Sequence, residues 1–576
     1  MTFLKKIQDF SIKDLLFLMG IFALFFLPFL YVWAGFPFFI NEDMNYVMLG
    51  GVIPYSDAGS YYAGAELFLR TGEIDYWNMR RPLNALLLAI RLKIVGGDFQ
   101  GALFIQAALC GLSGVFFVQT VSQILGRRVA FISILICFLW AQTYIPTTMT
   151  ESLGLCLGFL AITLLIQGTY LESASIFGVG IFVLTVGLNT RAGPFIILPF
   201  FFLWVLFSPL FKAQKKWAFF LIAGIILGFL YPKALLLLYG TSEGTGQMHA
   251  NFASTLYGLA RGGLTWVSGY EACEKLGITV ESEQAIWLYQ ESLRLILENP
   301  LNLIKGLFLN LCRFLKFFLN IKYVFGFFSY PIDWIFVSGL PFVLYYYFLC
   351  GKSFIRHYHS FQKISDIILI GVLGSFFSAA VTFDSGGIRT FAVTMPFIAL
   401  ALGMPFVRFS QKNSDLIKKQ AFFSLLSIFL ILAAGLILPS LIASKNKSSF
   451  SSQSRVKEMS HNLEDRVIEV RRLKSYPFLY VEDNPSKKHR RPTISAQRLS
   501  DLKNLETFFL REDLEHLKSH APYTLGLVFD EKTYQSFLIV GPLGWDRKEN
   551  QMEIQELSIK HKEGFSEALY FLKEKF

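Results

Sequence analysis

The strongest constraint on the fold is a series of long apolar runs. A membrane-spanning helix needs about 20 mostly apolar residues. In a chain of 576 residues that is 53% hydrophobic and only 16% charged, repeated runs of this kind predict an all-α polytopic membrane protein with about eleven transmembrane helices. We place the spans at residues 14–36, 99–125, 128–145, 150–168, 174–189, 193–211, 216–239, 330–350, 364–383, 389–408 and 420–442.

Basic residues in the short loops predict the orientation of these spans, because Lys and Arg mark the cytoplasmic side. They precede the first span and recur at 127–128, 212–216, 352–363 and 408–419. We therefore expect a cytoplasmic N-terminus, and an odd number of spans places everything after residue 442 outside the cytoplasm. The first run is longer than a signal-peptide core and no small-residue cleavage site follows, so it is expected to be an uncleaved anchor in the cytoplasmic (inner) membrane.

One further apolar run, at residues 300–322, is not counted as a span. Lys305, Arg313, Lys316 and Lys322 recur through it. Charges within a membrane span are costly, so the pattern favours an amphipathic helix lying in the membrane interface. If this run crossed the membrane, the later basic loops would fall on the wrong side.

Composition divides the chain at about residue 442. Residues 1–442 are predicted to form the transmembrane domain, with long outer loops at 37–98 and 240–329. Residues 443–576 are polar and are expected to form a separate domain on the exoplasmic (periplasmic) side.

Local patterns in this polar tail indicate a small α+β domain. A helical pattern runs over residues 455–473, and strand-like runs follow at 523–530 and 534–545. No catalytic motif is recognisable in the tail.

Charge and cysteine patterns argue against a nucleic-acid partner, a zinc site and a disulfide framework. The net charge is +11, but no basic stripe is interleaved with aromatic residues, so we expect no nucleic-acid partner. The 6 cysteines show neither CxxC nor Cys/His spacing, which predicts neither a zinc site nor a disulfide framework.

Ionisable residues gather at the outer ends of the predicted spans. Such groups usually face a protein interior or an aqueous cavity, so their convergence on one side predicts a shared site. There, a carboxylate can accept the proton of an attacking hydroxyl, while guanidinium groups bind the oxygens of a phosphate leaving group. Each residue alone also has a structural alternative, such as helix capping or contact with lipid headgroups. The residues are Asp57, Arg80, Arg81, Glu151, Arg191, Asp384 and Arg389.

The order of several motifs resembles the integral-membrane glycosyltransferases of the GT-C superfamily, especially the branch of protein mannosyltransferases and the aminoarabinose transferase that acts on lipid A. The resemblance covers roughly the first 410 residues and is a distributed pattern. The motifs are SDAGSYYAGAELFLRTGE, RRPLNALLLAI, TTMTESLGLCLGFLAI, GLNTRAGPFIILP, ENPLNLIKG and DSGGIRTFAVTMPFIAL.

The resemblance implies roles for individual residues. Asp57 matches the catalytic base of the first outer loop, and Glu151 matches a second acid that orients the acceptor or assists a cation. Arg81, which precedes Pro82, and Arg389 match the basic residues that meet the carrier phosphate.

Three further residues are expected to bind substrate or phosphate, namely Tyr61, Arg80 and Arg191. The chain departs from the family where Asp57 is followed by Ala58 rather than by a second acid. This departure argues against a metal-assisted mechanism, and a divalent cation is the only cofactor that we consider.

The resemblance implies an inverting membrane glycosyltransferase. Its donor would be a sugar on a polyprenyl-phosphate carrier in the bilayer, and its acceptor a hydroxyl of a glycolipid, polysaccharide or protein on the outer face of the membrane. Two alternatives remain open, a lipid-linked polysaccharide polymerase or ligase and a non-enzymatic transporter or flippase. A transporter is expected to carry charges near the middle of its spans and inverted repeats, neither of which is visible in the sequence.

Overall fold

The computed structural model describes most of the helical region and the strands that follow it. The described residues are 12–34, 48–49, 53–54, 56–74, 77–191, 193–208, 215–240, 250–278, 281–319, 333–358, 362–407 and 414–442, with strands between 467 and 574. The helices of the main bundle are α2 (Ile12–Leu24), α3 (Leu27–Ala34), α7 (Phe99–Ile124), α8 (Arg127–Ala141), α9 (Thr150–Tyr170), α10 (Ala174–Thr190), α11 (Ile197–Phe207), α12 (Lys215–Tyr239), α18 (Asp333–Tyr358), α19 (Gln362–Gly386), α20 (Met395–Gly403) and α21 (Ser414–Ile442).

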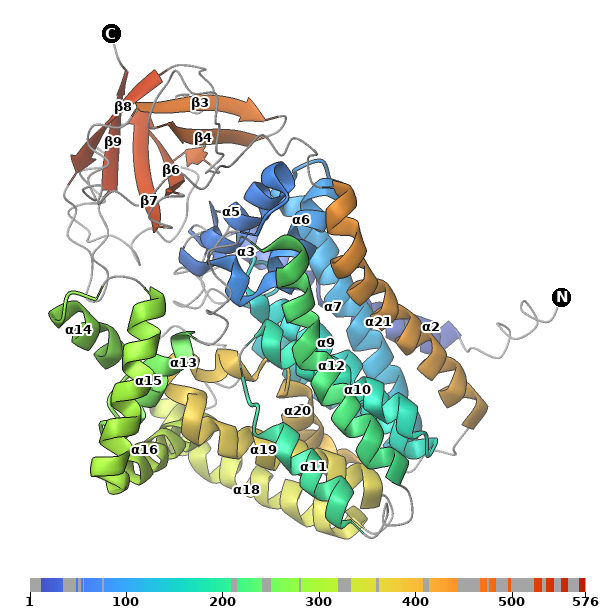
Figure 1. The fold of residues 1–576 in the computed structure, drawn as a ribbon. Helices are drawn as coiled ribbons and strands as arrows, with labels where there is room; N and C mark the ends of the chain where they lie inside the picture. The colour runs from blue at the N-terminus through green and yellow to red at the C-terminus, as the bar shows by residue number, and fades with distance from the viewer. Residues whose placement is uncertain are drawn as a thin grey trace.

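Helix α9 lies at the centre of this bundle. Its most apolar stretch is 100% buried, and it packs between α7 and α10, while α10 packs in turn on α12 (Figure 1). Small residues allow these close contacts: a Cβ atom on Gly224 of α12 would lie only 2.5 Å from the carbonyl oxygen of Gly178 in α10. Close approach of helix backbones through glycine is typical of packing within membranes.

Within the described residues, five helices are long and apolar enough to cross a membrane, and each coincides with a predicted span. They are Phe99–Ile124, Thr150–Tyr170, Lys215–Tyr239, Gln362–Phe383 and Asp415–Ile442. Three shorter apolar helices, at Ala174–Thr190, Ile197–Phe207 and Met395–Phe406, coincide with three further predicted spans. The first predicted span is divided, since α2 ends at Leu24 and α3 begins at Leu27. These helices agree with an all-α membrane region, and the total of about eleven spans stays a prediction.

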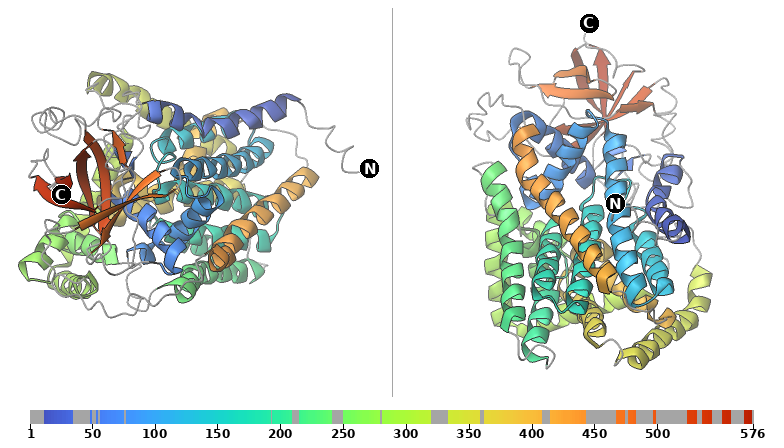
Figure 2. Two further views of the ribbon diagram at one scale, coloured as in Figure 1. Left: turned by 90° about the horizontal axis from the view of Figure 1, so that it is seen from above. Right: turned by 90° about the vertical axis from the view of Figure 1, so that its right-hand side faces the viewer.

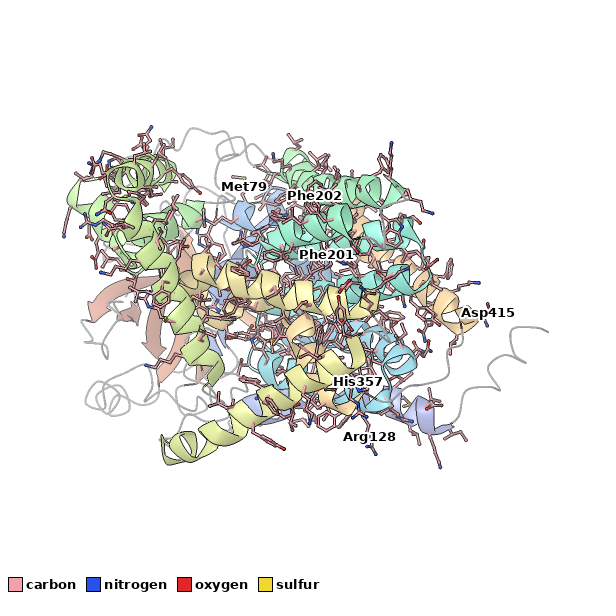
Figure 3. The ribbon with its side chains drawn as sticks, turned by 90° about the horizontal axis from the view of Figure 1, so that it is seen from below. Met79, Arg128, Phe201, Phe202, His357 and Asp415 are labelled. Carbon is pink, nitrogen blue, oxygen red and sulfur yellow. The ribbon has the colours of Figure 1, made fainter. Side chains whose placement is uncertain are left out.

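Large apolar side chains on the outside of the bundle fit a lipid environment. Phe201 and Phe202 are neighbours on α11, yet Phe201 is fully buried and Phe202 is 36% exposed (Figure 3). Exposed phenylalanine and leucine side chains recur on α12 and α21. In water such a surface would be an aggregation hazard, whereas in a bilayer it faces acyl chains.

The two long segments predicted as outer loops contain helices. Residues 37–98 include the short strands β1 (Met48–Leu49) and β2 (Ile53–Pro54) and the helices α5 (Ser56–Thr71), η2 (Asn78–Arg80) and α6 (Pro82–Ile94), whereas residues 240–329 include α13 (Ala250–Ala260), α14 (Val267–Lys275), α15 (Glu281–Glu298) and α16 (Pro300–Leu319). Helix α16 is the run that we expected to lie in the interface, and it is not among the five candidate spans. Figure 1 shows α13–α16 grouped beside the main bundle.

The described part of the C-terminal region forms one sheet of seven strands in the order β4-β3-β8-β9-β7-β6-β5. Its pairings are antiparallel, except that β7 and β9 are parallel. The strands are β3 (Val467–Leu473), β4 (Tyr476–Glu482), β5 (Ala496–Arg498), β6 (Tyr523–Asp530), β7 (Gln535–Pro542), β8 (Gln551–Leu557) and β9 (Leu569–Glu574).

Strands β6 and β7 lie where strands were predicted, but the helix predicted over residues 455–473 is wrong for its second part. Residues Val467–Leu473 pair along their whole length with β4. Cross-strand pairing of the β-branched residues in VIEVRRL with an apolar partner overrides the local helical pattern. Residues 455–466 lie outside the described residues, so the helical part of the predicted α+β domain stays a prediction.

The sheet lies at one end of the helical bundle, beside α5 and α6 (Figures 1 and 2). Strands β6 and β7 contact α5. Helix α21 runs from beside α6 to the opposite end of the bundle (Figure 1). The start of α21, which borders one of the basic loops of the sequence, is therefore separated from α5 and α6 along the bundle.

Candidate functional site

A fully buried carboxylate begins the central helix of the bundle. Glu151 lies in the first turn of α9 and its side chain is 0% exposed. One of its oxygens, Oε1, accepts a hydrogen bond of 2.6 Å from Nε of Arg389 and lies 3.5 Å from Nη2 of Arg191. A buried charge is stable only when it is paired and hydrogen-bonded, so Glu151 requires these two arginines.

Glycines allow the segment that carries Arg389 to approach α9 and α10. Arg389 lies in the 3-10 turn η4 (Gly387–Phe391), just before α20. A Cβ atom on Gly154 of α9 would lie 3.1 Å from Cβ of Ala392. On Gly158 and Gly193 it would clash with the carbonyl oxygens of Val393 and Thr390 respectively. Glycine at these positions therefore places residues 389–393 directly against the helix that carries Glu151.

The second carboxylate, Asp57, is accessible. It lies in the first turn of α5, where the positive end of the helix dipole favours a negative charge. Its side chain is 47% exposed, and Oδ2 lies 3.7 Å from Nη2 of Arg389. Arg389 therefore pairs with both carboxylates, one fully buried and one open to solvent.

Hydrogen bonds to the backbone fix α5 relative to α9. Thr148, two residues before α9, donates from Oγ1 to the carbonyl oxygen of Ala58 at 2.6 Å. The amide of Asn84 in α6 donates to the carbonyl oxygen of Thr148 at 3.3 Å, and the amide of Asn78 donates to that of Ser60 at 3.0 Å. The positions of Asp57 and Glu151 are thus linked through a few short contacts.

Arg81 lies near Asp57 at the start of α6. It precedes Pro82, the first helical residue, where the fixed φ of proline suits a helix start. The Arg81 side chain is buried, and Nη1 donates to the carbonyl oxygen of Arg80 at 2.7 Å. Burial lowers the pKa of Arg81 to about 10, so the group keeps its positive charge at neutral pH.

Tyr61 and Trp77 form an aromatic pair beside the charged residues. Tyr61 follows Asp57 by one helical turn, and its ring meets that of Trp77 edge to face at 4.7 Å. Burial raises the pKa of Tyr61, and the negative charge of Asp57 acts in the same direction, while Arg81 opposes both. Tyr61 is therefore a neutral phenol at physiological pH. The guanidinium of Arg80 lies 5.8 Å from the centre of the Trp77 ring.

The named charges at the site leave a positive surplus. Four arginines (Arg80, Arg81, Arg191 and Arg389) stand against two carboxylates. Within the described residues Nε of Arg191 is buried without a hydrogen-bond acceptor. Such a site favours an anion with several oxygen atoms.

The described side chains of the site do not fit a divalent cation. Both carboxylates are paired with Arg389, and a hard cation requires several free oxygen ligands. In the part of the chain that the structure describes, no three His, Cys, Asp or Glu side chains are grouped to hold a metal ion.

The structure brings Asp57, Glu151, Arg191 and Arg389 into direct contact, and places Tyr61, Arg80 and Arg81 beside them. The side chain of Asp384, which the sequence also placed here, lies outside the described residues.

Sequence reasoning missed the neutral residues that hold the site together, namely Trp77, Asn78, Asn84 and Thr148. One signal was present: Asn84 is the only amide in the otherwise apolar run PLNALLLAI. A polar side chain in such a run must find a partner inside the protein.

Comparisons with known proteins show a distant likeness in structure and none in sequence. No protein-family model and no curated protein matches the sequence. Among solved structures, the oligosaccharyltransferase of Archaeoglobus fulgidus in complex with zinc and sulfate is similar, with 14% sequence identity and a TM-score of 0.33. The match covers 68% of this chain and 49% of that chain, so the chain spans about half the length of the archaeal protein. A likeness at this level carries no conclusion about activity.

Proposed function

We propose that the chain is a membrane glycosyltransferase that moves a sugar from a polyprenyl-phosphate carrier to a hydroxyl acceptor. One observation carries the proposal: an accessible carboxylate, Asp57, lies beside a group of arginines at one end of an apolar helical bundle. A base and a phosphate-binding surface are the two parts that this transfer requires.

The reaction would proceed as a single displacement. The acceptor oxygen forms a bond to the anomeric carbon while Asp57 takes the hydroxyl proton. The bond from the anomeric carbon to the phosphate oxygen breaks, and the polyprenyl phosphate leaves with the electron pair. Arg81, Arg191 and Arg389 supply guanidinium groups for the oxygens of this leaving phosphate, where negative charge increases. Tyr61 and Arg80 both contact Trp77 beside these groups.

Exposure separates the roles of the two carboxylates. Asp57 is 47% exposed and can meet an acceptor, whereas Glu151 is 0% exposed and touches Arg389 and Arg191. We therefore assign Glu151 a positioning role: it fixes the two arginines rather than contacting substrate. No divalent cation enters the proposed step, because both carboxylates are already paired.

A lipid-linked polysaccharide polymerase or ligase would use the same base and phosphate chemistry, so the acceptor alone distinguishes it. A transporter is less well supported. Asp57, Arg81 and Arg389 lie at helix ends, outside the five candidate spans, whereas a transport site is expected near the middle of the membrane.

Loss of the protein is expected to leave its donor unused. Lipid extracts of cells that lack the protein should contain an accumulated polyprenyl-phosphate sugar, and a surface glycan should lack that sugar. Mass spectrometry of both fractions, with cells carrying the wild-type chain as the control, measures the two changes and identifies the sugar. Unchanged donor lipid and unchanged glycans would contradict the proposal.

The C-terminal region is expected outside the cytoplasm, on the same side as the proposed site. This follows from the basic residues in the short loops of the sequence and from the contact between the sheet and α5. A reporter active only outside the cytoplasm should function when fused after Lys447. Activity of a cytoplasm-only reporter at that position would refute both the orientation and the count of spans.

A further inference from the structure

A buried arginine outside the proposed site has no carboxylate partner among the described residues. Arg91 lies in the last turn of α6 and is 6% exposed. Its Nη1 donates to Oε1 of Gln106 in α7 at 2.5 Å. Burial lowers the pKa of Arg91 to about 10, so it stays charged at neutral pH. Burying such a charge is costly, and a neutral amide is a weak compensation for stability alone.

The side-chain NH2 group of Gln106 binds the backbone of a nearby segment. Its Nε2 donates to the carbonyl oxygens of Ile145 and Thr147, at 2.9 and 2.7 Å. Both carbonyls belong to residues 142–149, which connect α8 to α9 and which we call the connecting segment. Because Arg91 binds Oε1, the amide of Gln106 can present only its NH2 group to the segment. Arg91 thus fixes which way Gln106 points.

The connecting segment touches both carboxylate-bearing helices. Through Thr148 it binds the backbone of α5 next to Asp57, and its last residue, Met149, precedes α9 and Glu151. Ser152 in turn donates to the carbonyl oxygen of Tyr144 at 2.8 Å, which ties the first turn of α9 back to the same segment. A shift of this segment would therefore move Asp57 relative to Glu151 and Arg389.

We propose that Arg91 and Gln106 form a buried clamp that holds the connecting segment and thereby sets the position of Asp57 against the arginines of the site. Both are positioning residues, since neither touches the proposed substrate. The clamp itself does not depend on the proposed function; only its effect on transfer rests on that function.

Gln106→Glu tests the clamp without disturbing the charge of Arg91. The carboxylate still accepts from Arg91, now as an ion pair, but it cannot donate to Ile145 and Thr147 and instead repels their carbonyl oxygens. We expect only a small decrease in the melting temperature, because the new ion pair with Arg91 offsets part of this loss. Hydrogen–deuterium exchange of the backbone is expected to rise at least about tenfold in residues 142–149, because two hydrogen bonds are lost. Exchange in α15 should stay unchanged.

Gln167→Glu is the matched control. Gln167 is also a buried amide of the bundle and donates to Oγ1 of Thr120 at 2.8 Å, at the other end of α9. This variant should lower the melting temperature without raising exchange in the connecting segment. Equal exchange in that segment for wild type and Gln106→Glu, or equal increases in both variants, would overturn the clamp.

Transfer kinetics distinguish a positioning role from a purely structural one. In Gln106→Glu the phosphate-binding arginines remain, so KM for the polyprenyl-phosphate sugar should be unchanged while kcat falls at least about tenfold. An unchanged kcat alongside raised exchange would show that the clamp does not position Asp57. Absence of transfer by the wild-type chain would refute the proposed function and leave the exchange result standing.

Discussion

Asp57→Asn is expected to abolish most of the transfer while leaving the protein folded. Asparagine keeps the size of the side chain and is tolerated near a helix start, but it cannot accept the hydroxyl proton. General base catalysis typically contributes about 100-fold to 10,000-fold, so kcat should fall by that factor. The measurement is the rate of transfer from the polyprenyl-phosphate sugar by purified protein, with melting temperature as the control for folding.

Asp57→Glu sharpens this prediction. The added methylene moves the carboxylate by about an ångström, which near-attack geometry tolerates poorly, so little activity should return. Because the side chain is 47% exposed and its nearest basic contact is 3.7 Å away, neither substitution creates a buried unpaired charge. Normal transfer by a stable Asp57→Asn variant would remove Asp57 as the base.

Glu151→Gln is expected to destabilise the protein strongly. The change leaves Arg389 and Arg191 without the buried carboxylate that both contact, and breaking such a buried pair costs about 3–5 kcal/mol. Thermal melting of the purified protein in detergent measures the loss. The exposed ion pair of Glu172 and Lys363 offers a matched control, because its side chains are 68% and 32% exposed. Glu172→Gln should cost at most about 1 kcal/mol.

A double variant separates stability from function at Glu151. In Glu151→Gln with Arg389→Gln two opposite charges are removed together, and two amides can bond to each other. Stability should therefore recover in part relative to Glu151→Gln, while transfer stays low because an arginine of the proposed phosphate site is missing. If Glu151→Gln is as stable as the wild-type protein, the positioning role of Glu151 is wrong.

Helix periodicity and hydrophobicity predict the membrane region well, because a bilayer permits few alternatives to an apolar helix. The strands β6 and β7 were likewise visible as short alternating runs. Strand β3 could not be predicted in this way. Its pairing with β4 determines its conformation, and a local sequence pattern does not include that partner. In the long outer segments α16 was expected as an amphipathic helix, but helices such as α15 were missed, because their polar faces read as loop when only apolar length is counted.

The charged residues of the site could be selected from the sequence because ionisable groups at membrane depth are rare. The different roles proposed for the two carboxylates could not be predicted from the sequence. Exposure separates Asp57 from Glu151, and exposure depends on how residues 389–393 pack on Gly154 and Gly158. The pair of Arg91 and Gln106 could not be predicted from the sequence either. A single arginine or glutamine in a helix has many ordinary roles, and only the contacts in the structure indicate that these two hold the connecting segment.

The pairing of Glu151 with Arg389 also has a consequence for biosynthesis. The two residues are 238 positions apart, so a ribosome adding about 5–20 residues per second makes the acid roughly 12–48 s before its main partner. During that interval Glu151 has Arg191 as its nearest cation, at 3.5 Å in the finished structure, and lacks its shorter hydrogen bond. A chain that stops before Arg389 would keep an incompletely paired carboxylate within its apolar bundle, and such a charge is costly to bury. Full pairing of Glu151 therefore comes only after residue 389 of the 576 has been added.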